Sequence, residues 1–150
     1  MDTSNNSEAR ERFRGFVHMA AADRRFLSRA EEKALMESGV ERFGLRVDEA
    51  RSILLGSVDE SDFVLERDLD RRILALLEKE PGLKNHIGKK KFHEVARVYA
   101  KMSRGALSEE EARRNVKRVM IKNDFQPRRS YFASRRWFRR VDREKRVRAA

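Results

Sequence analysis

Two consecutive amphipathic helices are encoded by FRGFVHMAAADRRFLSRAE, residues 13–31, and this stretch decides the fold class. Its apolar residues recur at intervals of three and four, the spacing of one face of an α-helix. That face consists of Phe13, Phe16, Val17 and Ala20. Ser28 and Glu31 then form an S-x-x-E capping box, in which each side chain bonds the other residue's free backbone N–H. The stretch predicts one helix over residues 8–22 and a second that begins at Ser28 and ends near Gly44.

The remainder of the chain continues the helical pattern, and Ser108 with Glu111 supplies a second capping box. Further helices are predicted over roughly residues 47–55, 61–79, 90–102 and 108–122, with a last one from Pro127 or Ser130 to the C-terminus. No window shows the alternation and the turns of a hairpin, so no sheet is predicted. We therefore expect an all-α, compact bundle of about seven helices. Residues 1–126 would form the helical domain, and residues 127–150 a basic, aromatic-bearing C-terminal helix or tail.

A second stretch, FHEVARVYAKMSRGALSEEE at residues 92–111, follows the same order of signals as residues 13–31 with one residue inserted. Each begins with a Phe-led amphipathic helix, continues through a short basic loop and Leu-Ser, and ends in a capped helix. One interpretation is two similar helical hairpins that arose by internal duplication. The other is that any two capped amphipathic hairpins look alike, and both remain open.

Composition narrows the classes to which this chain of 150 residues can belong. It contains no cysteine, which excludes disulfides, thiolate metal sites and cysteine nucleophiles. Residues 1–14 are polar and show no signal-peptide core, and no run approaches the roughly 18 apolar residues of a membrane span. We expect a cytoplasmic protein.

Charge is distributed unevenly along the chain. Residues 1–83 hold 14 basic and 18 acidic side chains, residues 84–124 hold 12 and 5, and residues 125–150 hold 10 and 2, within a total net charge of +11. A chain that changes from acidic to basic in this way favours phosphate polymers or anionic membrane surfaces at its basic end. It also favours self-association between unlike ends.

The strongest functional signal is the basic and aromatic C-terminal segment together with an upstream lysine run. The residues predicted to bind a polyanion are Lys89, Lys90, Lys91, Arg128, Arg129, Arg135, Arg136, Arg139, Arg140 and Arg143. On a helix, Arg135, Arg139 and Arg143 would lie one turn apart in an outward row able to reach successive phosphates. The aromatic residues predicted to stack on an unpaired base, or to dock the segment on the body, are Tyr131, Phe132, Trp137 and Phe138.

Several partners fit this segment. Nucleic acid or a ribonucleoprotein is favoured, followed by a protein with an acidic face and by a peripheral anionic membrane surface. A further alternative is that the aromatic residues dock the helix while the arginines only increase solubility. No major-groove recognition motif is present, so sequence-specific DNA reading is not predicted. We expect a non-enzymatic binding or assembly module.

The residues Phe16 to Asp23, followed by Leu27, Glu31-Glu32, Gly44-Leu45 and Glu49-Ala50, carry a family resemblance. Over roughly residues 10–55 the chain resembles the tellurite-resistance TerB-like helical domain, which also forms the N-terminal region of some membrane-anchored DnaJ-type co-chaperones. The resemblance implies a helical fold and a stress-response or co-chaperone-type adaptor. Arg24 stands where the family has glycine, and the loop is basic rather than acidic.

Metal and acid-base chemistry have few candidates. The resemblance carries over only Asp23, Glu31 and Glu32 as weak metal candidates, and neighbouring arginines would compete for these carboxylates. Asp62, Glu66 and Asp70 share a helical face, for which a solvated, salt-bridged surface is the favoured interpretation. His18, His86 and His93 lack the spacing of zinc ligands; His18 would be a structural or a surface residue, and the other two would assist anion binding if protonated. No phosphate-binding glycine loop occurs. We expect no catalytic residue and no cofactor.

Overall fold

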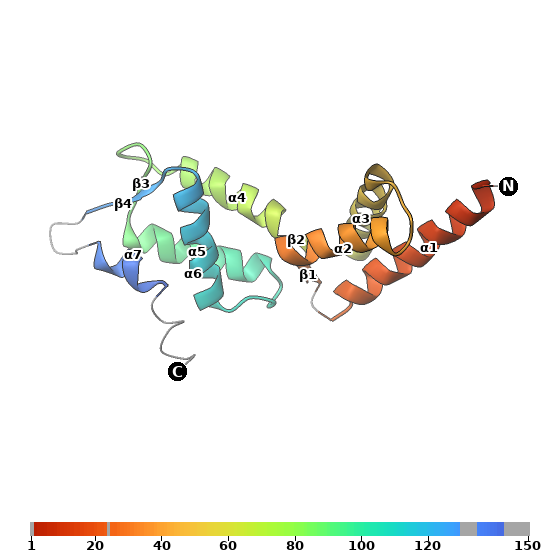
Figure 1. The fold of residues 1–150 in the computed structure, drawn as a ribbon. Coiled ribbons are helices and arrows are strands. Elements are labelled where there is room, and N and C mark those ends of the chain that lie inside the picture. Colours follow the sequence, from red (N-terminus) through yellow and green to blue (C-terminus); the bar gives the residue numbers. More distant parts are fainter. Residues whose placement is uncertain (1, 24, 130–134, 143–150) are drawn as a thin grey trace. The chain divides into compact units, whose positions relative to one another are not determined.

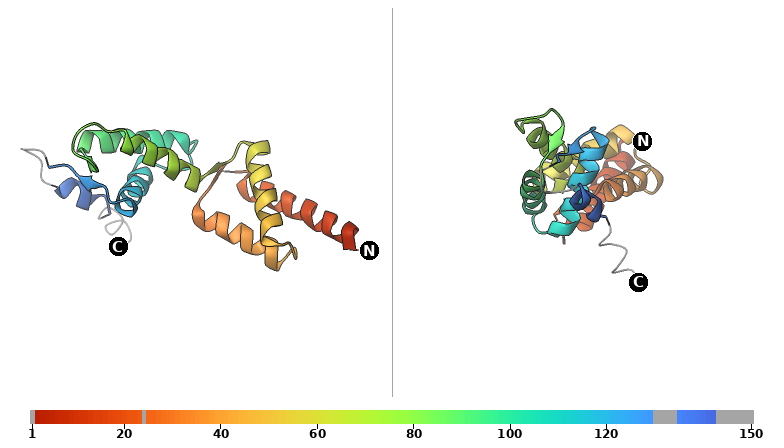
Figure 2. Two further views of the ribbon diagram at one scale, coloured as in Figure 1. Left: turned by 90° about the horizontal axis from the view of Figure 1, so that it is seen from above. Right: turned by 90° about the vertical axis from the view of Figure 1, so that its left-hand side faces the viewer.

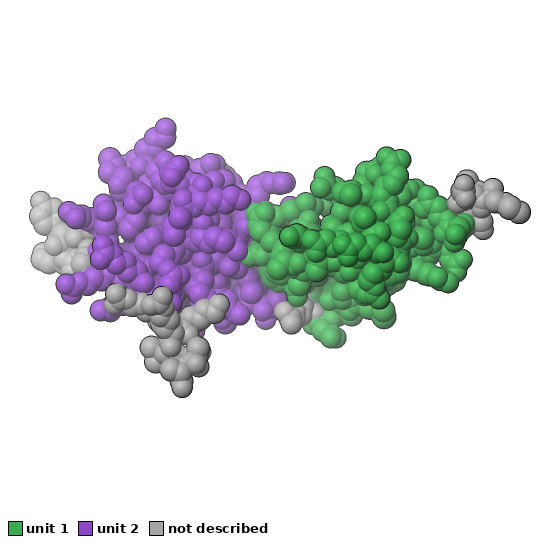
Figure 3. Space-filling model, in the orientation of Figure 1, with its two compact units in different colours: residues 1–67 green, residues 68–150 purple. Residues whose placement is uncertain are grey.

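The computed structural model describes residues 2–23, 25–129 and 135–142, of which residues 2–4 are described by their backbone alone. Over these residues the fold is helical (Figure 1). The predicted all-α fold of about seven helices is confirmed. The chain divides into two compact units, unit 1 at residues 1–67 and unit 2 at residues 68–150 (Figure 3). The sequence analysis predicted a domain boundary between residues 126 and 127. In the structure, residues 68–126 and the last helix both belong to unit 2.

Unit 1 contains three long helices and one pair of short strands. The elements are α1 (Asp2–Ala21), β1 (Phe26–Leu27), α2 (Arg29–Glu41), α3 (Val47–Ser61) and β2 (Val64–Leu65). Helix α3 packs against both α1 and α2, and the core between them is built around the fully buried Phe13, Val17, Ala50 and Leu54. Phe16 packs against this core, but Ala20 is exposed and Ala21 is buried in its place.

Gly39 lets α2 approach its neighbours closely. A Cβ atom at this position would lie 2.9 Å from Ala50 Cβ and 3.0 Å from Phe13 Cζ, closer than side chains in a packed core come. Gly39→Ala is therefore expected to destabilise the protein by about 2 kcal/mol, as overpacking of a dense core does. Gly15→Ala is the matched control, since its Cβ would meet nothing within 4 Å and alanine favours helix by up to about 1 kcal/mol. Thermal unfolding followed by circular dichroism should show opposite shifts for the two variants.

Unit 2 contains four helices and a second pair of short strands. Helix α4 (Glu66–Glu78) begins at the end of unit 1, and the elements that follow are β3 (His86–Ile87), α5 (Lys89–Met102), α6 (Glu109–Lys122), β4 (Gln126–Pro127) and α7 (Arg136–Arg140). Helices α5 and α6 pack against each other and cross in the view of Figure 1, and Figure 2 shows the same elements from two further sides. The core of unit 2 contains the fully buried side chains of Ile73, Phe92, Tyr99, Val116 and Met120.

The four strands correct the prediction that the chain has no sheet. Each unit holds one parallel pair of two-residue strands, β1 with β2 and β3 with β4. Strands of two residues are too short for a detectable alternation of polar and apolar residues. Each strand follows a residue in the left-handed backbone region by one or two positions; these residues are Arg25, Asp62, Asn85 and Asp124, with φ between 50° and 59°.

Asp62 also corrects the predicted helix over residues 61–79. Its φ of 58° and ψ of 38° end α3, and the chain then forms β2 before α4 begins at Glu66. Aspartate tolerates this conformation better than most side chains because its short polar group bonds locally. Phe63, which was predicted to lie within that helix, instead lies in the connection after α3. It is buried and belongs to the unit 1 core.

The element order also changes the register of the proposed repeat. A strand separates α1 from α2, whereas α5 and α6 are joined by a turn at Arg104 and Gly105, with φ of 57° and 82°. The order helix, strand, helix, helix, strand occurs first in α1 to β2 and again in α4 to β4. This order equates Leu27-Ser28 with Ile87-Gly88 rather than with Leu107-Ser108.

Both predicted capping boxes are present. The Ser28 and Ser108 hydroxyls accept hydrogen bonds from the N–H groups of Glu31 and Glu111 at 3.2 Å, and those glutamates accept from the serine N–H groups at 2.8 Å. Among the described residues, no helix has the length and apolar content required to cross a membrane.

Candidate anion-binding pocket

Aromatic contacts hold α7 against α5. The centres of the Trp137 and Phe92 rings are 5.0 Å apart. The centres of the Phe138 and Phe92 rings are 6.1 Å apart, and these two rings pack edge to face. Such pairs contribute roughly 0.5–1.5 kcal/mol each beyond their buried area. The structure thus places Trp137 and Phe138 as docking residues, and Trp137 remains half-buried with part of its surface available.

Lys117 is a second anchor of α7, and the sequence analysis did not single it out. It is only 8% exposed, and its Nζ donates to the Phe138 carbonyl at 2.9 Å and to the Asp142 carboxylate. The same ammonium lies 4.8 Å from the centre of the Phe138 ring. A lysine satisfies a free carbonyl at the end of a helix and complements its dipole. The ammonium therefore helps to position α7 on α6.

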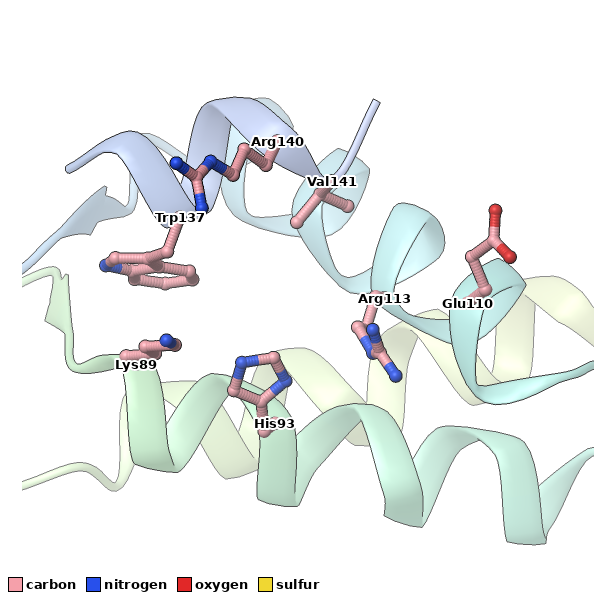
Figure 4. A pocket seen from close by; sticks show the side chains of 7 residues that line it. All are labelled: Lys89, His93, Glu110, Arg113, Trp137, Arg140 and Val141. Atoms are coloured by element: carbon pink, nitrogen blue, oxygen red, sulfur yellow. The ribbon is translucent and has the colours of Figure 1, made fainter. Parts of the chain in front are cut away.

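Between these docked helices lies a pocket of about 180 Å³. It is lined by Lys89 and His93 from α5, Glu110 and Arg113 from α6, and Trp137, Arg140 and Val141 from the last segment. Figure 4 shows Trp137 and Lys89 at one end, His93 on the α5 side, and Glu110 at the far end with its carboxylate directed away from the indole. Three cationic side chains from three helices thus meet around one aromatic wall.

Most of this positive charge is not paired with carboxylates of the residues that the structure describes. Within the described part of the chain, neither Lys89 nor Arg140 forms an ion pair. Arg113 has one long contact of 3.5 Å with the exposed Glu109. Glu110 pairs with Arg114 at 2.7 Å, which reduces its effect on the pocket. The pocket is therefore a cationic recess in which two of the three charges, those of Lys89 and Arg140, are exposed and have no ion pair with a described carboxylate.

His93 responds to this environment. Burial lowers the pKa of its imidazole below the usual value of 6.5, and the neighbouring charges of Arg113, Lys89 and Arg97 lower the pKa further. The ring is consequently neutral near pH 7, so in the free protein it does not meet the condition of protonation under which it was expected to assist anion binding. It offers one N–H donor and one acceptor instead.

The lowered pKa of His93 predicts a pH dependence of stability. Below pH 6.5 the unfolded chain takes up a proton that the folded protein resists, so stability is expected to fall as the pH drops from 6.5 toward the folded pKa. His93→Gln should flatten this part of the profile, whereas the control His86→Gln should leave it in place. The measurement is urea unfolding at pH 7.5 and 5.5 with the fluorescence of Trp137, the sole tryptophan.

The first turn of α5 adds to the positive potential beside the pocket. It consists of Lys89, Lys90 and Lys91, contains no acidic residue, and follows Gly88, which makes no side-chain cap. By contrast, α2 and α6 each begin with acidic residues and a capping box, and α3 begins with acidic residues of which Glu49 accepts from the Arg46 backbone N–H. Cations at a helix N-terminus oppose the dipole by roughly 0.3–1 kcal/mol each, and a bound anion would relieve that cost.

The other predicted cations differ in availability. Lys90, Arg129, Arg136 and Arg139 are exposed. Lys91 contacts Glu80 at 3.5 Å and Glu94 at 3.7 Å, and the Arg128 guanidinium donates to the Pro81 carbonyl at 3.2 Å. Arg135 departs from the predicted outward row, because it is half-buried and its Nε has no hydrogen-bond partner in the described structure. Arg143, Tyr131 and Phe132 lie outside the described residues.

The weak metal candidates are engaged in other contacts. Glu31 closes the capping box of α2, and Glu32 pairs with Arg67 at 3.0 Å, while Asp23 is exposed. The described residues contain no group of three or more histidine or acidic side chains placed to hold a metal ion. Glu31 and Glu32 therefore have structural partners, at the starts of α2 and α4.

Two carboxylates that the sequence assigned to a solvated surface are buried. Glu66 is 6% exposed and accepts from the Arg29 backbone N–H at 2.7 Å. Asp70 is 8% exposed and accepts from the Tyr99 hydroxyl at 2.9 Å and from Arg118. A helical face of alternating charges predicts solvent exposure only when no other element covers it, and here both carboxylates bond groups on other elements.

Unit 1 has a larger hollow of about 520 Å³ along α1 and α3, but its charges are paired. Arg10 forms an ion pair with Glu49, and Arg14 lies 3.7 Å from Glu60. Hydrogen bonds from Arg10, from the Arg46 backbone and from Asn6 lower the pKa of Glu49 to about 2. The smaller pocket of unit 2 is therefore the better candidate for an anion.

Comparison of the chain with protein-family models, with curated proteins and with solved structures finds no match.

Proposed function

We propose that unit 2 is a non-enzymatic nucleic-acid-binding module whose cationic pocket and surrounding arginines and lysines contact the phosphate backbone. The observation that carries the proposal is the meeting of Lys89, Arg113 and Arg140 beside Trp137 and His93. If α7 only docked on the rest of unit 2, its aromatic residues alone would be sufficient. The cations on the pocket rim give that helix a second use.

The charge of the unit supports this assignment. Residues 68–150 hold 25 basic and 11 acidic side chains, a formal charge of +14, whereas residues 1–67 hold 11 and 14, a charge of −3. A charge of this size raises the local concentration of a polyanion and accelerates its association. Phosphate contacts of this kind are independent of sequence, which agrees with the lack of a major-groove recognition motif.

Trp137 favours single strands or strand ends over continuous duplex. Its ring is anchored on Phe92 on one side and lines the pocket on another, so the indole is held in place before a ligand arrives. Stacking of an unpaired base on such a ring contributes roughly 1–3 kcal/mol and tolerates any base. Bases within an intact duplex are already stacked and cannot reach it.

The test measures the affinity of the full chain for a fluorescent single-stranded oligonucleotide at several salt concentrations. Contacts with three or more phosphates predict that log K falls with log salt with a slope of about −2 or steeper. Absence of binding, or binding that ignores salt, would overturn the proposal. A defined protein that co-purifies after nuclease treatment, with no oligonucleotide binding, would favour the adaptor with an acidic partner. Binding only to anionic vesicles would favour the membrane surface.

A further inference from the structure

We infer that the pocket formed by α5, α6 and α7 receives a terminal phosphate monoester of a nucleic-acid strand, an inference that rests on the proposed function. Internal phosphates would contact the exposed cations outside the pocket, such as Lys90, Arg129 and Arg139. Only the strand end would enter the recess.

The size of the pocket sets the first constraint. Its volume of about 180 Å³ is below the roughly 300–1,000 Å³ of pockets that enclose a whole drug-sized ligand. The recess therefore admits one small group, with the remainder of the ligand outside. A phosphate at a strand end meets this condition because only one of its oxygens continues into the chain. An internal phosphodiester has a chain leaving on both sides, and a recess of this volume has little room for both.

Charge sets the second constraint. A phosphate monoester carries a charge of about −1.5 to −2 near pH 7, against −1 for an internal diester. The three cations Lys89, Arg113 and Arg140 come from different helices and line the same recess, so their charges act on a group bound there from more than one side. Arginine is suited to this task because its planar guanidinium binds phosphate with two parallel hydrogen bonds. The local charge thus matches a dianion better than a diester.

The aromatic wall gives a place for the nucleoside that carries the phosphate. Trp137 forms one end of the pocket, next to Lys89 (Figure 4). A terminal nucleoside lacks a stacking neighbour on one side, so it can turn toward an indole at little cost. Phosphate and base of the same end nucleotide would then be held together by adjoining parts of one site.

The experiment compares three oligonucleotides of identical sequence and length, with a 5′-phosphate, with a 3′-phosphate, or with hydroxyl groups at both ends. Affinity for the full chain is measured at fixed salt. We expect one phosphorylated form to bind about tenfold more tightly than the hydroxyl form, and the preferred end shows which terminus enters. Inorganic phosphate should compete with this increment and leave the remaining affinity unchanged.

Arg140→Gln and Arg139→Gln form a matched pair, since both side chains are exposed, lie on α7 and carry the same charge. Only Arg140 lines the pocket. Arg140→Gln should remove most of the preference for the phosphorylated end, whereas Arg139→Gln should lower the affinity for all three oligonucleotides equally. Equal loss of preference in both variants would overturn the inference.

A second readout uses His93, which faces Lys89 and Arg97 on its own helix, Arg113 and Glu109 on α6, and the Trp137 ring on α7. A bound dianion would offset the cations, so the pKa of the imidazole, measured by nuclear magnetic resonance, should rise when the phosphorylated strand is added. If all three oligonucleotides bind equally and with the expected salt dependence, the inference fails and the proposed function stands. If none binds, the proposed function itself fails.

Discussion

The double substitution Lys89→Glu with Arg140→Glu is expected to weaken binding of the single strand that carries the preferred terminal phosphate about 25-fold at 0.1 M salt. Each lost phosphate contact removes about 0.7 from the slope of log K against log salt, so two contacts remove about 1.4, which is a factor of about 25 at 0.1 M. Repulsion by the new carboxylates adds to this loss. A titration by fluorescence anisotropy over a range of salt concentrations measures both the affinity and the slope.

The control for this substitution is Arg72→Glu with Lys79→Glu, which changes the net charge by the same amount on exposed positions of unit 2 that do not line the pocket. The general field of the protein decreases equally in both variants. A loss of affinity as large in the control as in the pocket variant would show that net charge, and not the pocket, determines binding. Both variants should retain the wild-type unfolding transition, since neither Lys89 nor Arg140 has an ion pair among the described residues.

The parts of the fold that local sequence determines were predictable. Capping boxes at Ser28 and Ser108 depend on residues three positions apart, and both helices begin where the sequence predicts. The apolar spacing of α5 and α6 likewise predicted the buried Phe92 and Val116. These elements need no knowledge of distant contacts.

The parts that depend on distant pairing were not predictable. Strand β1 pairs Phe26 with Val64, and two residues carry no periodic signal of their own. The same pairing interrupts the helix that apolar spacing had extended through Phe63. Asp70 looked solvated because its partners Tyr99 and Arg118 come from helices far along the chain. Burial in each case is decided by tertiary contacts.

The candidate site was predicted in part. Lys89, Trp137 and Arg140 were named from the sequence because they stand in dense basic and aromatic stretches. Arg113 was missed, since it lies within a helix of mixed charges and becomes notable only when α5 and α7 approach it. Lys117 carried a weak signal, since its position between Val116 and Val119 places it on the buried side of α6, whereas the neighbouring Arg118 gives the pair the look of ordinary surface charge. The sequence pattern does not show that α5, α6 and α7 approach one another in space, and this approach is what forms the pocket.

Asp70→Ala is expected to destabilise unit 2 by about 3 kcal/mol. The carboxylate accepts from the Tyr99 hydroxyl at 2.9 Å and from Arg118 at 2.8 Å and 3.0 Å, which joins α4 to α5 and α6. Removing one partner of a buried ion pair costs about 3–5 kcal/mol, and the low end applies because the Arg118 side chain is 43% exposed and can turn to water. The Tyr99 hydroxyl cannot turn to water because the side chain is fully buried. A buried donor left without an acceptor costs about 1–3 kcal/mol.

Two further variants separate the parts of this effect, and urea unfolding followed by Trp137 fluorescence measures all three within unit 2. Tyr99→Phe removes the donor together with its need for a partner, so it should cost only about 1 kcal/mol. Asp68→Ala, on the same helix and with only a long 3.9 Å contact to Arg71, should change stability by less than about 0.5 kcal/mol. If Asp70→Ala were no more harmful than Asp68→Ala, the buried network would contribute nothing to stability. The packing of α4 against α5 and α6 would then depend on apolar contacts alone.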